Sequence, residues 1–290
     1  MSIHYQEVTY IYSPKSPFEY KALNNITLDL NMNKITAIIG HTGSGKTTLV
    51  QHLNALLTPT NGTLEVCDFV VTNDKKKNKN LKQLRKRVGL VFQFPEYQLF
   101  EETIAKDIGF GPKNFGVPKE EIDEITKKVI KQVGLDESFL DKSPIELSGG
   151  QKRRVAIAGI LAMNPDVLVL DEPTAGLDPL GAKEMLDLFI ELNKQGKTII
   201  IVTHEMDYVL EYCDLCVVVN SGEIVFEGEP IKLFVNDEIM KRVGIEPPLS
   251  IEFGKELINN GFKIDLGNVR DVTSLSKEII KTLNGGDNYE

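Results

Sequence analysis

The sequence contains no tryptophan, three cysteines and four histidines in 290 residues, and it has no long hydrophobic run. Ile199 to Val202 is among its longest purely apolar stretches, far below the roughly 18 residues that span a bilayer. We therefore expect no transmembrane helix, and the polar-interrupted start predicts no signal peptide, which favours the cytosol. Cys67, Cys213 and Cys216 are odd in number and lack the second ligand pair of a metal site, so buried reduced thiols are expected.

Basic residues are also in deficit. There are 33 lysines and arginines against 42 aspartates and glutamates, which gives a net charge of −9 and a pI near 5.2. This balance argues against a broad binding surface for the phosphates of nucleic acid. The length allows one large domain with a small appendage or two moderate domains, and alternating helical and strand-like patterns favour the α/β class.

The most informative stretch lies between Ile38 and Thr48. Its letters GHTGSGKT fit the pattern G-x-x-x-x-G-K-[ST], after a strand-like run and before a helical one. Glycines let successive backbone N–H groups surround one anion, and the dipole of the following helix adds positive charge. We expect Lys46 to reach the β- and γ-phosphates and Thr47 to ligate Mg²⁺. A glycine-rich turn with an incidental lysine is the alternative.

Further polar side chains stand at the ends of apolar runs that predict buried parallel strands. They are Gln93, the adjacent pair Asp171 and Glu172, and His204. Because the carboxyl ends of parallel strands meet at one edge of a sheet, we expect these groups to converge with Lys46 on one crevice. Asp171 is placed to hold Mg²⁺ through water, and Glu172 is placed to polarise an attacking water.

Helical signals dominate from Phe94 to about Ala162, which predicts a helical insert. Near its end stands LSGGQ, residues 147–151, where Ser148 and two glycines precede a helix. This is a second helix N-terminus able to hold an anion. Taken alone, an ordinary serine cap followed by a glycine turn is the simpler interpretation.

The first 31 residues predict two strands that pair as an antiparallel edge, Ile3 to Thr9 and Ile26 to Asn31. Tyr12 stands just beyond the first strand and offers a ring able to stack on a purine. Later in the chain, Leu215 to Val219 and Glu223 to Phe226 predict a hairpin.

Taken together and in this order, GHTGSGKT, Gln93, LSGGQ, VLVLDEP, the GLD loop at 176–178 and His204 resemble the nucleotide-binding subunits of ABC transporters. The resemblance runs from Ser2 to about Phe234. It implies the P-loop NTPase fold of ABC ATPases, an α/β core with an antiparallel β edge and a helical subdomain, to which the tail adds a small C-terminal helical appendage. It also implies ATP and Mg²⁺ as cofactors, and hydrolysis at a dimer interface where LSGGQ completes the partner's site.

The resemblance also assigns roles to single residues. The implied catalytic residues are Glu172, His204 and Gln93. The implied metal ligands are Thr47, Gln93 and Asp171. The implied nucleotide-binding residues are Tyr12, Gly40, His41, Thr42, Gly43, Ser44, Gly45, Lys46, Thr47, Thr48, Ser148, Gly149, Gly150, Gln151 and Asp178.

Within this superfamily, Phe92 to Gly116 resembles the energy-coupling factor (ECF), or cobalt-type, ATPases. The extended loop Ser13 to Leu23 is similar to one of the two ATPase paralogues in such complexes. The resemblance implies uptake of a vitamin or metal ion by a protein that is peripheral at the cytoplasmic face of the cell membrane. The implied partners are a second ABC ATPase (a heterodimer favoured over a homodimer), a transmembrane coupling subunit and a substrate-binding membrane subunit, with no nucleic acid.

Two other functions belong to different classes. A non-transport ABC ATPase of DNA repair or translation usually carries tandem cassettes, a coiled-coil insert or a cysteine-rich module, and the sequence shows none of these. A regulatory module that binds nucleotide without turnover is disfavoured by the presence of Glu172 and His204.

The domain organisation expected from these patterns has two parts. Residues 1–236 are expected to form an ABC nucleotide-binding domain, with its helical subdomain at about 94–162. Residues 237–290 are expected to form a small C-terminal helical region that packs on the ATPase domain, on itself or on a second chain. The resemblance to ECF ATPases favours the second chain and hence a dimerisation region, and a tail folded back on its own domain is the alternative. Two helices are predicted in this tail, each with one apolar stripe. The stripes are Leu249, Phe253 and Leu257 in the first and Leu275, Ile279 and Leu283 in the second.

The segment from Gln93 to Asp107 is the expected contact with the membrane partner. It offers apolar anchors at Phe94, Tyr97, Leu99 and Phe100 and an acidic rim at Glu96, Glu101, Glu102 and Asp107. The alternative is that the aromatic side chains simply pack the helical insert.

Overall fold

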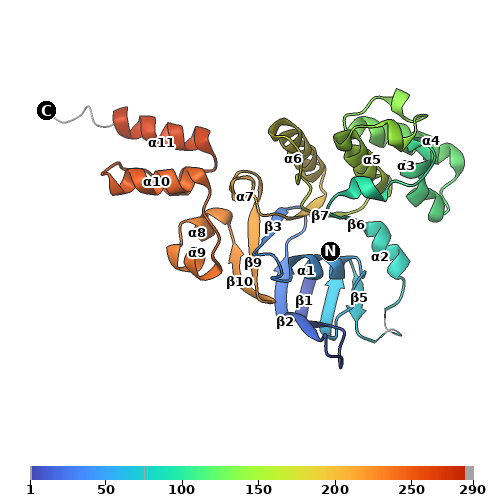
Figure 1. The fold of residues 1–290 in the computed structure, drawn as a ribbon, viewed down its shortest axis with the longest axis horizontal. Helices are drawn as coiled ribbons and strands as arrows, with labels where there is room; N and C mark the ends of the chain where they lie inside the picture. Colours follow the sequence, from blue (N-terminus) through green and yellow to red (C-terminus); the bar gives the residue numbers. More distant parts are fainter. Residues whose placement is uncertain (1, 75, 77, 285–290) are drawn as a thin grey trace.

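The computed structural model describes residues 2–74, 76 and 78–284. Its first layer is a four-stranded antiparallel sheet in the order β2-β1-β4-β5 (Figure 1). The strands are β1 (Ile3–Tyr12), β2 (Tyr20–Leu30), β4 (Asn61–Val66) and β5 (Phe69–Thr72). The predicted pairing of the first two strands is confirmed, with Ile3 opposite Leu30. The strand β5 was not predicted.

The second layer is a six-stranded sheet in the order β10-β9-β3-β8-β7-β6. Its strands are β3 (Ile35–Ile39), β6 (Val88–Val91), β7 (Val167–Asp171), β8 (Thr198–Val202), β9 (Leu215–Asn220) and β10 (Glu223–Gly228). All neighbours are parallel except the hairpin β9–β10. The strands β3, β7 and β8 are buried along their whole length, as expected for parallel strands covered on both faces.

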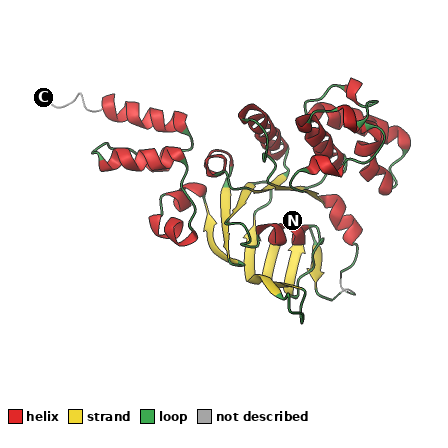
Figure 2. Ribbon diagram, in the orientation of Figure 1, coloured by secondary structure: helices red, strands yellow, loops and turns green. Residues whose placement is uncertain are grey.

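The helix α1 (Lys46–Leu53) joins the two layers. Leu49 and Leu53 of this helix belong to one apolar core with Tyr5 of the first sheet and Val169 of the second. The other face of the six-stranded sheet packs against α6 (Pro179–Lys194) and the helical insert. Figure 2 shows the strands in the lower centre of the view, with α1 among them and most other helices to the left, above and to the right.

The helical insert lies between β6 and β7. After α2 (Leu81–Arg87) and β6, it contains the 3-10 turn η1 (Pro95–Gln98), α3 (Ile104–Asn114), α4 (Lys119–Gln132), the turns η2 (Glu137–Phe139) and η3 (Pro144–Glu146), and α5 (Gly149–Leu161). Buried apolar residues of α3, α4 and α5, among them Ile108, Ile130 and Ile157, share one core.

Most of the expected acidic rim is paired within the insert itself. Glu96 accepts hydrogen bonds of 2.9 and 3.1 Å from Arg153, which is almost fully buried. Glu102 pairs with Lys106, and Asp107 accepts from the backbone N–H of Glu101 at 3.1 Å. The expectation that Glu96 belongs to an acidic rim facing a partner is therefore wrong, because its carboxylate is mostly buried and holds η1 against α5.

The chain continues from the hairpin β9–β10 into a group of helices beside that edge of the sheet (Figure 1). They are α8 (Pro230–Phe234), α9 (Asp237–Val243), α10 (Leu249–Asn259), the 3-10 turn η4 (Leu266–Asn268) and α11 (Val272–Asn284). The helix α7 (Met206–Tyr212) follows β8 and packs against α8. Val209 of α7 and Leu233 of α8 belong to one apolar core. The last residues of the predicted dimerisation region, 285–290, lie outside the described residues.

The two tail helices are where they were predicted. The first helix, α10, buries a face other than its predicted apolar stripe. Ile251 and Gly254 of α10 are buried, whereas Leu249 is 70% exposed and Phe253 is 50% exposed. In α11, Leu275 is buried as expected and Leu283 is 58% exposed. No helix within residues 2–74, 76 and 78–284 is long and apolar enough to cross a membrane.

Candidate nucleotide site

The loop between β3 and α1 takes a shape that only glycine accepts at two positions. Gly40 and Gly45 have φ angles of 146° and 109°. A Cβ atom on Gly40 would collide with the Val219 carbonyl oxygen, and one on Gly45 would lie 2.6 Å from the Ala22 carbonyl oxygen. Gly45 also forms the left-handed N-cap of α1. The predicted glycine-rich turn into a helix is confirmed, and it brings the first N–H groups of α1 to the loop.

Lys46, the first residue of α1, is half-buried and folds back over the loop. Its Nζ donates to the carbonyl oxygens of Gly40 at 2.7 Å and His41 at 2.8 Å. Burial lowers the pKa of this amine, and the carboxylates of Glu172 and Asp171 oppose that effect. A cation held at the centre of an anion-binding loop is suited to contact phosphate oxygens.

Thr47 and Asp171 meet beside the loop although 124 residues separate them. The Thr47 hydroxyl donates a 3.0 Å hydrogen bond to Asp171 Oδ2. Asp171 is buried at the tip of β7, and burial raises its pKa while the bond from Thr47 lowers it. This pair of oxygen ligands fits a magnesium ion completed by waters and substrate phosphates. Among the described residues, no group of three or more His, Cys, Asp or Glu is arranged to hold a metal alone.

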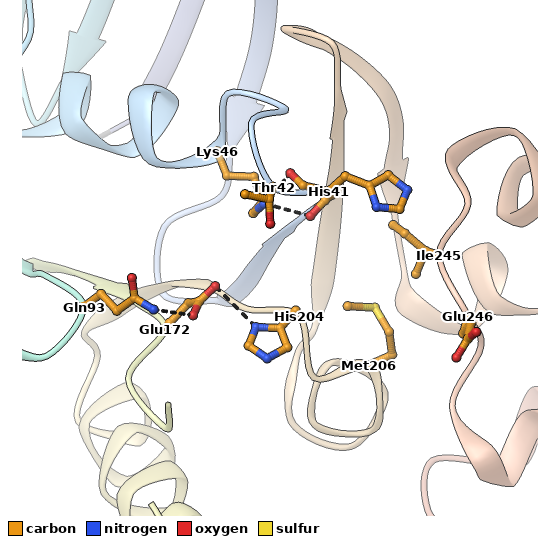
Figure 3. A pocket seen from close by; sticks show the side chains of 10 residues that line it. His41, Thr42, Lys46, Gln93, Glu172, His204, Met206, Ile245 and Glu246 are labelled. Carbon is orange, nitrogen blue, oxygen red and sulfur yellow. Dashed lines mark hydrogen bonds and ion pairs between the residues drawn. The ribbon is translucent and has the colours of Figure 1, made fainter. Parts of the chain in front are cut away.

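Glu172 lies between two polar side chains from other strand ends (Figure 3). Gln93 Nε2 donates to its carboxylate at 2.8 Å, and His204 Nδ1 lies 3.3 Å from the other carboxylate oxygen. Glu172 has a φ of 49°, an unusual value for a residue with a side chain, and its N–H donates to the Val202 carbonyl at 2.9 Å. Backbone strain of this kind is found at functional sites, where surrounding bonds hold a side chain in place.

These groups open onto one cavity of about 640 Å³. Its lining contains seven of the residues predicted from the sequence, namely Gly40, His41, Thr42, Lys46, Gln93, Glu172 and His204. The predicted convergence on one crevice is observed for Lys46, Gln93, Glu172 and His204, whereas Asp171 is buried beside Thr47 and does not line this cavity.

The opposite wall of the cavity was missed (Figure 3). It consists of Met206 at the start of α7 and of Ile245 and Glu246, which follow α9. Gly244 lies so close to the loop that a Cβ atom on it would be 2.9 Å from His41 Nε2. The only sequence signal was a glycine able to end a helix, which does not indicate what the chain reaches next.

Other predicted site residues lie outside this cavity. Tyr12 is 36% exposed, and its hydroxyl lies 3.2 Å from Thr48 Oγ1 at the side of α1. Ser148 and Gln151 form a reciprocal capping box at the start of α5. Asp178 caps α6 by accepting from the Gly181 N–H at 2.8 Å. Both caps confirm helix starts and leave the contact with nucleotide a prediction.

Solved structures show the same architecture. The chain matches cbiO1 from Clostridium perfringens, part of the ABC transporter complex cbiONQ, with a TM-score of 0.72 and 37% identity over 87% of this chain and 98% of that one. It also matches the ATP-binding cassette MJ0796 in a dimeric post-hydrolysis state bound to ADP and Pi, with a TM-score of 0.70 and 28% identity over 79% of this chain and 98% of that one. The fold and the site together define an ABC-type ATPase.

Sequence relatives indicate which group of ABC-type ATPases the chain resembles. Residues 23–175 match the family model for the ABC transporter. The energy-coupling factor transporter ATP-binding protein EcfA2 of Enterococcus faecalis is 52% identical over 91% of this chain and 92% of its own length. The protein of the same name in Lactococcus lactis is 48% identical over 99% and 100%. The chain belongs to the ABC transporter family, within its energy-coupling factor ATP-binding proteins.

Proposed function

We propose that this ATPase energises uptake of a vitamin or a metal ion through separate membrane subunits, from the cytoplasmic face of the membrane. The observation that carries the proposal is the placement of Glu172 between Gln93 and His204, in the same cavity as Lys46. A carboxylate beside a phosphate-binding loop is suited to hydrolysis and not to binding alone.

The triphosphate lies along the loop after β3, with Lys46 on its β- and γ-phosphates and the N–H groups of α1 around them. Thr47 and Asp171 would hold Mg²⁺, and Gln93 would supply a further side-chain oxygen ligand. When bound, the ion neutralises charge that develops on the phosphate oxygens.

Glu172 accepts a proton from the water that attacks the γ-phosphorus. A bond forms from the water oxygen to phosphorus, the bond to the β,γ-bridging oxygen breaks, and ADP leaves with that electron pair. His204 and Gln93 fix the carboxylate on either side, so little reorganisation is needed at the moment of reaction.

A second ATPase chain completes the site. LSGGQ does not line the cavity of its own chain, and Cβ atoms on Gly149 and Gly150 would meet no described atom within 4 Å. The start of α5 thus presents open backbone, which suits it to cover a nucleotide held by a partner. Asp178 contributes at the same interface, and Tyr12 stacks on the adenine.

The membrane coupling subunit docks on the helical insert near η1 and α3. Tyr97 is 85% exposed and Phe100 is 65% exposed, and Phe100 meets Phe110 edge to face at 4.9 Å. A groove of about 450 Å³ beside Phe110 is bordered by Lys106 and Glu101. Exposed aromatic anchors next to a groove are typical of a protein interface.

The C-terminal helices hold the two ATPases together, in a heterodimer, when nucleotide is absent. Their outward side chains include four large apolar ones, because Leu249, Phe253, Ile280 and Leu283 are between 50% and 70% exposed. Such a group is unfavourable in water and is stabilised by burial against a similar surface. We propose no contact between this chain and the substrate-binding membrane subunit.

Reconstitution tests this function. The chain is co-expressed with a second ATPase and the membrane subunits of its own organism, and the complex is placed in vesicles with labelled vitamin or metal ion outside. We expect uptake that requires ATP on the ATPase side and is lost with Lys46→Ala. Co-purification with ATP hydrolysis but no uptake of any tested solute would contradict the importer proposal.

A further inference from the structure

Three aromatic rings form a continuous column between β1 and α1. The ring centroids of Tyr12 and Tyr10 lie 4.8 Å apart at an interplanar angle of 87°, and those of Tyr10 and His52 lie 5.0 Å apart at 81°. Tyr10 and Tyr12 are alternate residues of one strand, so their side chains leave the same face. Edge-to-face contacts of this kind favour one ring orientation over others.

Both ends of the column are attached to Thr48, a residue of the phosphate-loop helix. The Tyr12 hydroxyl lies 3.2 Å from Thr48 Oγ1, and His52 Nδ1 lies 2.7 Å from the Thr48 carbonyl oxygen. The exposed ring of Tyr12 is therefore linked to Thr48 in two ways. One is the direct contact of its hydroxyl, and the other runs through the rings of Tyr10 and His52.

His52 acts in this column as a neutral ring. It is fully buried, and burial lowers its pKa to about 4, so the ring is neutral near neutral pH. Because the Thr48 carbonyl oxygen can only accept, the tautomer that fits this contact has its proton on Nδ1, which donates to Thr48. Its Nε2 has no hydrogen-bond partner among the described residues. The imidazole thus offers Tyr10 a packing surface and offers α1 one hydrogen bond, without a charge.

We propose that Tyr10 and His52 are positioning residues for recognition of the nucleobase. They hold the Tyr12 ring in one orientation while it stays 36% exposed, so that a purine stacks on it without first ordering the ring. Through Thr48, the base and the phosphates are bound by one rigid unit. This inference rests on the proposed contact between Tyr12 and adenine.

The test compares ATP, CTP and inorganic triphosphate on the intact ATPase complex, because triphosphate reports on the phosphate loop alone. Loss of the Tyr10 ring in Tyr10→Leu should weaken ATP binding by roughly 2- to 12-fold and reduce the preference for ATP over CTP. The affinity for triphosphate and the kcat should stay at wild-type values. Tyr10→Phe keeps the ring and should restore ATP binding, and Phe18→Leu, at an 84% exposed ring outside the column, is the matched control.

Each outcome has one reading. If Tyr12→Ala binds ATP as well as wild type, the base does not contact Tyr12, and that part of the proposed function is wrong together with this inference. If Tyr12→Ala weakens ATP binding while Tyr10→Leu does not, only the positioning role is wrong. If Tyr10→Leu loses affinity for triphosphate as much as for ATP, the residue supports the fold and the inference is overturned.

Discussion

The side-chain amide of Gln93 donates a 2.8 Å hydrogen bond to the carboxylate of Glu172. Gln93 follows β6, where the chain enters the helical insert, and Glu172 follows β7, the first strand after that insert. The bond therefore joins the start of the proposed membrane-facing insert to the carboxylate proposed to activate water. We expect a movement of the insert at Gln93 to change the hydrogen bonding of Glu172, which would couple docking to hydrolysis.

Removing the amine of Lys46 should weaken nucleotide binding. A charge-assisted contact to phosphate is worth roughly 1.5–3 kcal/mol, so Lys46→Ala should bind ATP about 10- to 150-fold more weakly and lose turnover with it. Equilibrium titration with ATP measures this change. Lys232→Ala, which removes a surface lysine paired with Glu229, is the control and should bind normally. Wild-type affinity for ATP in Lys46→Ala would show that Lys46 does not contact the phosphates.

Breaking the pair of Glu96 and Arg153 should destabilise the helical insert. The side chain of Arg153 is 3% exposed and that of Glu96 is 14% exposed, so Glu96→Lys leaves a buried charge unpaired, at a cost of about 3–5 kcal/mol. Glu102→Lys changes a carboxylate that is 82% exposed, so it should cost much less stability than Glu96→Lys. Urea unfolding of both variants checks this difference, and equal losses would show that the Glu96 pair is not structural.

Polar substitution on the outer face of α10 should separate the nucleotide-free ATPases. Leu249→Ser with Phe253→Ser removes two exposed apolar groups without touching the buried Ile251, so the fold should persist. We expect a smaller mass by light scattering without nucleotide, with ATP binding retained. Val70→Thr, at an exposed position of β5, is the control. A double variant that stays as dimeric as wild type would place the contact elsewhere.

Acid should destabilise the protein through His52. Its pKa falls from 6.5 to about 4 on folding, so the unfolded chain binds more protons between these values and stability is lost as pH falls through that range. The difference corresponds to about 3 kcal/mol. His52→Asn keeps a donor for Thr48 but does not titrate, and it should show a smaller loss of unfolding free energy between pH 7.5 and pH 5. An identical loss in both proteins would assign the acid sensitivity to other groups.

The phosphate loop and the strand ends could be predicted from the sequence because their chemistry is local. A glycine pattern before Lys46 has few structural solutions, and apolar runs that end in Gln93 or Glu172 place those side chains at one sheet edge. The same reasoning places Asp171 near the phosphate loop, and in the structure Thr47 contacts Asp171 although 124 residues separate them.

The remaining features depend on packing between distant segments. Nothing near Ile245 or Glu246 indicates that they line the cavity of a loop some 200 residues earlier in the chain. On α10 the apolar stripe with Leu249 and Phe253 is not the face that packs within the chain, because the helix approaches η4 through Gly254, where a Cβ atom would lie 2.5 Å from Leu266 Cδ2. Close approach through a small residue leaves no hydrophobic signal in the sequence.

The central claim is that Glu172 activates the water that attacks ATP, and Glu172→Gln tests it most directly. Glutamine keeps the shape and can still accept from Gln93, but it is a far weaker proton acceptor. Phosphate release by the assembled complex should fall by roughly 100- to 10,000-fold while ATP affinity stays near that of wild type. Phosphate release at the wild-type rate would contradict the account.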